Sequence, residues 1–204
     1  MVTHSPSPDY SSAISHALHL LHSRLPDAYT YHCAAHTEND VIPAVMRLAQ
    51  LAGVSEREEQ QLHVAAAFHD LGYIESPQNH EAIGIYFLTV KLSELGFDSA
   101  EIDIITGMIE ATRMPQSPRT ELEALMADAD LDSLGRDDFL QTSKALWQEQ
   151  AALGNVTEWR GWLRGQLRFL QTHRYFTPVA RALRDDGKLR NVALLLQIIG
   201  DERQ

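Results

Sequence analysis

The chain has 204 residues, of which 44% are hydrophobic and 22% are charged. This length can bury a hydrophobic core, and the composition is that of a globular protein rather than a fibrous or disordered one. The formal net charge of −11 argues against binding to long nucleic acid, because duplex binding needs several Lys or Arg to displace counterions. Cys33 is the only cysteine, so an intramolecular disulfide and a thiolate-rich zinc site are excluded, and any metal must be bound by His and carboxylate.

The first ten residues, MVTHSPSPDY, contain no apolar segment of the kind found in signal peptides. No window of the sequence reaches the ~18 uninterrupted apolar residues that would span a bilayer. We therefore expect a cytoplasmic protein that does not insert into a membrane.

Apolar residues recur at three- and four-residue spacing through most of the chain, as in Ile14, Leu18, Leu21 and Leu25. This periodicity predicts an all-α fold, a compact helical bundle. The helices are expected at about 9–25, 37–53, 55–71, 79–95, 99–112, 119–134, 136–153, 156–173 and 176–199.

Residues that begin or end helices support these bounds. Ser55 with Glu58 three residues later is typical of a capping box, and Gly72 is a helix stop. No repeat or long linker divides the chain, so we predict a single domain over residues 1–204. Residues 136–204 are expected to pack as additional helices on the same core, with a small separate lobe as the alternative.

Two histidines, His32 and His36, lie one helical turn apart in the segment YHCAAHT. This spacing lets both face the same pocket. A chain with ten histidines also produces such a pair by chance.

An adjacent pair, His69 and Asp70, ends the apolar run AAAF and is expected in the last turn of a helix. Neighbouring side chains on a helix point about 100° apart, so a cation bound by both must lie over the seam between them. The negative end of the helix dipole favours a cation there. The alternative is that the pair only caps a helix end.

Three carboxylates, Asp128, Asp130 and Asp132, lie within an apolar run. Their mutual repulsion is costly without a cation or a basic partner. The alternative is a solvated acidic helix face, which we expect for at least one of them. Two imidazoles and two carboxylates would form a ligand set suited to Mn, Fe, Zn or Mg.

In chain order, His36, His69-Asp70 and Asp130 resemble the H…HD…D signature of the HD-domain phosphohydrolases. The resemblance covers about residues 30–135 and includes the stretch similar to YHxxxHT, the Gly-Tyr after HD, and the sequence HEAIG from residue 80. It implies an HD-type helical domain and a divalent metal (Mn, Mg, Fe, Ni or Zn) held by His36, His69, Asp70 and Asp130. The implied activity is that of a phosphomonoesterase or phosphodiesterase, which hydrolyses a nucleotide or other small phosphate ester through a metal-activated water.

Similarity to the cyclic-nucleotide phosphodiesterases favours Asp130 over Asp128 as the last ligand, because their metal-binding aspartate directly precedes a leucine, as Asp130 precedes Leu131. Asp128 remains open. The same enzymes place a proton-donating histidine four residues before the first metal ligand, which implies this role for His32. Asp70 would orient the water.

The chain also departs from the family pattern. Dinuclear members usually supply two more histidines between HD and the final aspartate, and here only His80 is available. A single metal per chain is therefore favoured over a close pair, although Glu110 or water could complete a second site. An iron oxygenase on the same scaffold and a catalytically silent nucleotide-binding regulatory module remain as alternatives.

Arg113, in a loop marked by Pro115 and Pro118, carries a planar fork of donors suited to a substrate phosphate. A surface salt bridge is the other interpretation. The expected partner is a small phosphorylated substrate, with a nucleotide favoured, and the chain is expected to be a monomer or a homodimer.

Overall fold

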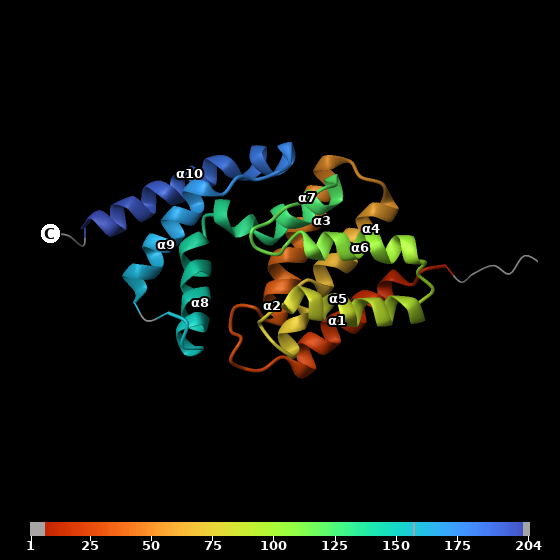
Figure 1. Ribbon diagram of the computed structural model, residues 1–204. Coiled ribbons are helices and arrows are strands. Elements are labelled where there is room, and N and C mark those ends of the chain that lie inside the picture. Colours follow the sequence, from red (N-terminus) through yellow and green to blue (C-terminus); the bar gives the residue numbers. More distant parts are fainter. Residues whose placement is uncertain (1–6, 157, 202–204) are drawn as a thin grey trace, which may run out of the picture.

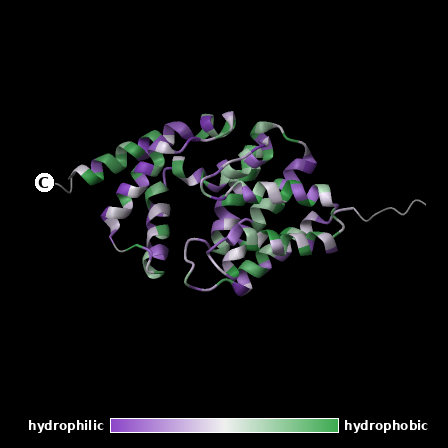
Figure 2. Ribbon diagram, in the orientation of Figure 1, coloured by the Kyte–Doolittle hydropathy of each residue, from purple (hydrophilic) through white to green (hydrophobic). Residues whose placement is uncertain are grey.

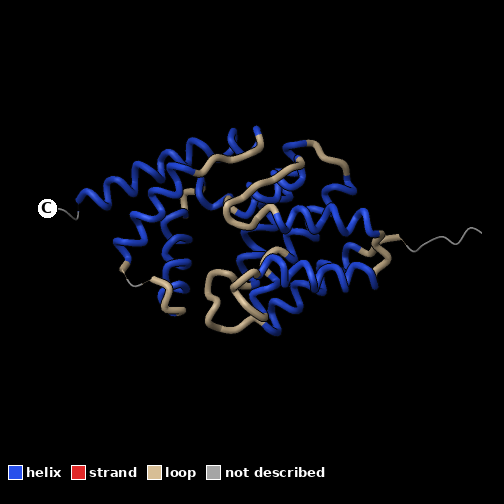
Figure 3. The backbone as a smooth tube through the Cα atoms, viewed as in Figure 1, coloured by secondary structure: helices blue, strands red, loops and turns tan. Residues whose placement is uncertain are grey.

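The computed structural model describes residues 7–156 and 158–201. Within these two ranges every regular element is a helix, as Figure 3 shows, so the predicted all-α class is confirmed. None of the described helices is both long and apolar enough to cross a membrane.

The α-helices are α1 (Tyr10–Arg24), α2 (Ala34–His36), α3 (Ile42–Ala52), α4 (Glu56–Phe68), α5 (His80–Glu94), α6 (Ser99–Glu110), α7 (Glu121–Asp130), α8 (Phe139–Ala152), α9 (Trp159–Thr172) and α10 (Pro178–Asp201). Three shorter elements lie between them: a π-helix, η1 (Thr37–Val41), and two 3₁₀ turns, η2 (Leu71–Ile74) and η3 (Asp132–Gly135).

Each of the nine predicted helices corresponds to an α-helix of the structure, and the differences lie at the ends. The capping box is present, since Ser55 accepts from the backbone N–H of Glu58 while the Glu58 side chain accepts from Ser55. The expectation that His69 and Asp70 lie in the last turn of a helix is wrong, because α4 ends at Phe68 and a 3₁₀ turn follows Asp70. The chain must bend there to admit α5.

Gly72 makes this bend tight. A Cβ on Gly72 would lie 1.9 Å from the carbonyl oxygen of His80, so only glycine allows the start of α5 to lie so close to η2. This contact brings His80 next to the residues that follow α4.

The core is built around α4, which packs against α1, α3, α6 and α7. Its last five residues, 64–68, are fully buried, and three of them are alanines that let neighbouring helices lie close. Figure 2 shows hydrophobic and hydrophilic residues interleaved along most helices, as expected of amphipathic elements with one buried face.

The last three helices, α8, α9 and α10, form a group beside this core in Figure 1. The α10 helix crosses η3 and also contacts α3 and α7. Arg184 of α10 donates to both oxygens of the buried Asp132 at 2.7 and 2.8 Å, and Arg47 of α3 donates to the same carboxylate at 3.1 Å. This ion-pair cluster around the buried Asp132 ties the C-terminal helices to the rest of the fold.

Candidate metal centre

Three side chains from three separate helical segments converge at the end of α4. His36 ends α2, His69 follows α4, and Asp130 ends α7. One ligand atom from each lies within 4.8 Å of the others, and these three residues could hold a metal ion.

Asp70 lies beside this group. Its Oδ2 is 3.2 Å from Nε2 of His69 and 3.9 Å from Nε2 of His36, while Oδ1 of Asp130 is 3.6 Å from Nε2 of His69. When two ligand atoms each lie about 2.1 Å from the same metal ion, they are about 3 Å apart at adjacent coordination positions and about 4 Å apart at opposite ones. The observed separations fall in this range.

Both imidazoles are turned so that Nε2 faces the centre. Nδ1 of His69 donates to the backbone oxygen of Ala66 at 2.7 Å, which fixes the ring and leaves Nε2 without a proton when the ring is neutral. Nδ1 of His36 faces Asp40, on the opposite side of the ring from the centre.

A second observation also indicates that the centre suits a divalent cation. Within the described part of the chain, Nε2 of His69 and Oδ2 of Asp70 are buried and make no hydrogen bond, since their close approach lacks hydrogen-bond geometry. Buried polar atoms without partners are rare and unfavourable. A ring nitrogen and a carboxylate oxygen that point toward one spot are the donors that Zn, Mn or Fe takes.

Opposing effects set the charge of the centre. Burial disfavours charge on His69, but the carboxylates of Asp70 and Asp130 outweigh it and raise its pKa to about 9. Burial alone would raise the pKa of Asp70, whereas the neighbouring His69 holds that pKa far below its usual range. Burial raises the pKa of Asp130 despite His69. Positive charge at this spot is therefore strongly favoured, and a bound cation would supply it.

The other two carboxylates of the acidic run have different roles. Asp128 accepts from the backbone N–H groups of Phe176 and Thr177 at 2.8 Å and from the Thr177 hydroxyl at 2.7 Å, so both of its oxygens are used at the start of α10. Asp132 is held by Arg184 and Arg47. The expectation that at least one of the three lies on a solvated face is wrong, because Asp128 and Asp132 are buried and Asp130 is only partly exposed.

His32 lies at the same centre, and its partner was not found from the sequence. Nδ1 of His32 is 2.6 Å from Oε1 of Glu149, which is fully buried on α8. The other oxygen of Glu149 accepts from the backbone N–H groups of Tyr31 and His32 at 2.8 and 3.0 Å. Burial opposes charge on His32, yet the hydrogen bond to Glu149 raises its pKa above the ordinary value.

His80 and Arg113 lie on the other side of Asp70. Nε2 of His80 is 3.5 Å from Oδ1 of Asp70 and 3.6 Å from the buried Glu81. Arg113 is mostly exposed, and its Nε is 3.8 Å from Glu81. The salt-bridge interpretation of Arg113 therefore has a partner, and Nη2 of Arg113 also donates to Oδ1 of Asn79 at 3.4 Å. Glu110 is exposed and lines a neighbouring pocket with Arg113.

A cavity of about 490 Å³ opens over the centre. His36, Asp70, Asp130 and His32 are among its lining residues, together with Arg113. The C-terminal helices α8 and α9 contribute Leu146, Gln166 and Phe169 to its lining.

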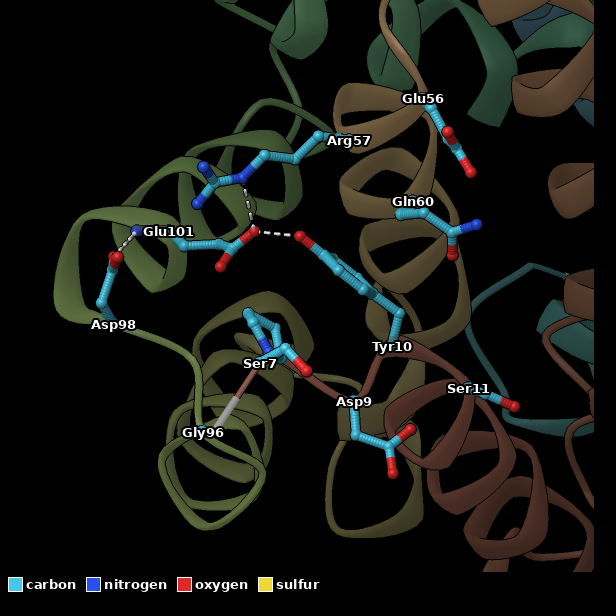
Figure 4. A pocket seen from close by; sticks show the side chains of 11 residues that line it. Ser7, Asp9, Tyr10, Ser11, Glu56, Arg57, Gln60, Gly96, Asp98 and Glu101 are labelled. Atoms are coloured by element: carbon cyan, nitrogen blue, oxygen red, sulfur yellow. Dashed lines mark hydrogen bonds and ion pairs between the residues drawn. The ribbon is translucent and has the colours of Figure 1, made fainter. Parts of the chain in front are cut away.

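A larger hollow, of about 1050 Å³, lies between the start of α1 and the first turns of α4 and α6. Figure 4 shows Tyr10, Arg57 and Glu101 meeting there. Glu101 accepts from Tyr10, from Arg57 at 3.2 Å and from Gln61 at 3.0 Å, and Asp98 caps α6. The carboxylates of Glu101 and Asp98 therefore connect or cap helices. None of the described residues that line this hollow is a histidine, so it offers no pair of imidazoles to a metal.

Comparison with known protein families, with characterised proteins and with solved structures found no match to this chain. The fold and the site define an all-α protein with a candidate His-His-Asp metal centre.

Proposed function

We propose that this protein is a metal-dependent phosphohydrolase of the HD type that acts on a nucleotide or another small phosphate ester. The observation that carries the proposal is the convergence of His36, His69 and Asp130, with a buried ring nitrogen lacking a partner, beside a cavity that is lined by His36, Asp130 and His32. The H…HD…D order of these residues adds support.

A divalent metal bound by His36, His69, Asp70 and Asp130 would lower the pKa of a water and polarise a phosphoryl oxygen. Asp70, with its second oxygen turned toward His80, would accept a hydrogen bond from the attacking water and orient it. His32 would donate its proton to the leaving oxygen, while Glu149 holds the ring by Nδ1 and keeps the charged form favoured.

The cavity supports a small substrate. Its volume of about 490 Å³ is in the usual range for pockets that enclose small molecules. The exposed Arg113 at its edge would bind phosphate oxygens through its fork of donors. The chain's net charge of −11 disfavours a long polynucleotide in the same place.

Hydrolysis by the purified protein would test the proposal. Phosphate release is measured from a panel of nucleotides and small esters with Mn, Mg and Ni. His69→Ala should lose about 1,000-fold or more in activity, since metal activation contributes several kcal/mol to the transition state. His63→Ala, a partly buried histidine on α4 that does not line the cavity, is the matched control and should keep near wild-type activity.

A fully active His69→Ala variant with unchanged circular dichroism would contradict the proposal. Metal analysis of the same samples separates the alternatives. Two irons per chain with oxygen consumption would indicate an oxygenase, and tight nucleotide binding without turnover would indicate a silent binding module.

A further inference from the structure

The segment directly after His36 is unusual, because the chain leaves α2 through the π-helix η1 over Thr37–Val41. Single π-helical turns inside α-helices are rare and occur frequently at functional sites. This turn carries Asp40, whose Oδ2 lies 3.6 Å from Nδ1 of His36. Asp40 therefore faces the side of the ring opposite the candidate metal position.

Nδ1 of His36 needs a hydrogen-bond acceptor on the side of the ring that faces Asp40. A neutral imidazole that binds a metal through Nε2 carries its proton on Nδ1, and such a proton is almost always donated to a carboxylate, a carbonyl or water. Nδ1 of His36 is buried and has no full hydrogen bond within the described residues. The Asp40 carboxylate lies beside this nitrogen. The distance from Oδ2 of Asp40 to Nδ1 of His36 is a few tenths of an ångström longer than a hydrogen bond.

Asp40 is itself held from behind. Its Oδ1 accepts from the guanidinium of Arg136 at 2.6 Å, and Arg136 is fixed in turn by two hydrogen bonds to Asp138, at 2.8 and 2.6 Å. Arg136 is mostly buried, with its side chain 19% exposed. One oxygen of Asp40 is thus occupied by the arginine, which leaves the other for the imidazole.

We propose that Asp40 is a positioning residue that orients His36 for metal binding, and that Arg136 holds Asp40 in place. This inference rests on the metal centre of the proposed function. Asp40 does not line the cavity over that centre, and it acts only through His36.

Metal affinity gives the first test, without any measurement of activity. Mn²⁺ binding to the purified chain is followed by the electron paramagnetic resonance signal of the free ion. Asp40→Ala should bind Mn²⁺ about 10–100-fold more weakly than wild type, and Asp40→Asn should fall between them because it keeps a neutral acceptor. Glu38→Ala is the matched control, since it removes a carboxylate of the same π-helical turn that pairs with His22 at 3.0 Å instead of His36, and it should bind within about twofold of wild type.

The tautomer of His36 gives a second readout, in the metal-free protein. Long-range ¹H–¹⁵N correlation spectra should show the proton of the neutral ring on Nδ1 in wild type and a mixture of the two tautomers in Asp40→Ala. Circular dichroism verifies that each variant is folded.

The outcomes distinguish this inference from the proposed function. If wild type binds no metal of the series Mn, Mg, Fe, Ni and Zn, the metal centre itself is refuted. If wild type binds Mn²⁺ and Asp40→Ala binds it equally well, or if the wild-type His36 proton is on Nε2, only the role of Asp40 is overturned.

Discussion

At the scale of single residues, the contact that matters most beyond the predicted ligands is made by Glu149. Its three hydrogen bonds go to the Tyr31 and His32 segment, so the carboxylate fixes both the backbone and the ring of His32. Burial would raise the pKa of Glu149, but the bond to His32 outweighs it and lowers that pKa. Both shifts favour a charged pair with the proton on His32, as the proton-donor role proposed for His32 requires.

Replacing Glu149 by Gln should shift the pH profile of hydrolysis. Glu149 raises the pKa of His32, so the protonated form survives to higher pH in wild type than in Glu149→Gln, and the alkaline limb of kcat should move to lower pH in the variant. At neutral pH kcat should fall by about 10–100-fold, because part of the general-acid contribution is lost. Mn²⁺ affinity should stay unchanged, and an unmoved alkaline limb would show that His32 is not the proton donor.

At the scale of elements, the helices follow from local patterns that the sequence contains. Apolar spacing predicts α1 to α10 apart from the three-residue α2, and the Ser55 and Glu58 pair marks the start of α4. The structure ends α4 at Phe68 and not at residue 71, because Gly72 permits a contact with His80 that no local pattern encodes.

The residues of the candidate site also fall into two groups, those that the sequence predicts and those that it does not. Four candidate ligands, His36, His69, Asp70 and Asp130, can be predicted from the sequence because their order resembles a known signature. Glu149 could not be found, since along the chain it is one glutamate among many on helix faces, and its burial against His32 depends on how α8 packs. Phe169 and Gln166 reach the cavity for the same reason.

The crossing of α10 over η3 gives a prediction at this scale. A Cβ on Gly187 would lie 1.9 Å from the backbone oxygen of Gly135, so Gly187→Ala must push the two elements apart. We expect the free energy of unfolding to fall by about 1–3 kcal/mol, as in other overpacked contacts. Gly200→Ala on the same helix meets nothing within 4 Å and should be neutral or stabilising by up to about 1 kcal/mol. Denaturant unfolding measures both, and equal stability of the two variants would mean that the crossing is loose.

At the scale of the whole molecule, the centre lies where the two groups of helices meet. The candidate metal ligands come from α2, α7 and the segment after α4, whereas Glu149 and Phe169 come from α8 and α9. Phe169 also packs against His173, with ring centroids 5.9 Å apart, and His173 lies beside Lys188 of α10. Loss of the packing between α9 and α10 would therefore displace one wall of the cavity.

His173 makes this packing sensitive to acid. It is buried, with 9% of its surface exposed, and Lys188 lies 3.5 Å from its Nδ1. Burial first, and then the charge of Lys188, lower the pKa of His173 to about 4, while Asp185 opposes the shift and Arg174 adds to it. In the unfolded chain the pKa returns to about 6.5.

Between about pH 4 and 6.5 the unfolded chain binds a proton on His173 that the folded protein does not bind. The free energy of unfolding that neutral His173 contributes is therefore complete above about pH 6.5, and it is lost as the pH falls toward 4. The loss amounts to about 3 kcal/mol of unfolding free energy. His173→Gln should remove it, so that the difference between wild type and variant in denaturant unfolding changes across this window and is constant above it. Parallel curves from pH 4 to 7 would mean that His173 has the same pKa in the folded protein as in the unfolded chain, and would contradict its burial beside Lys188.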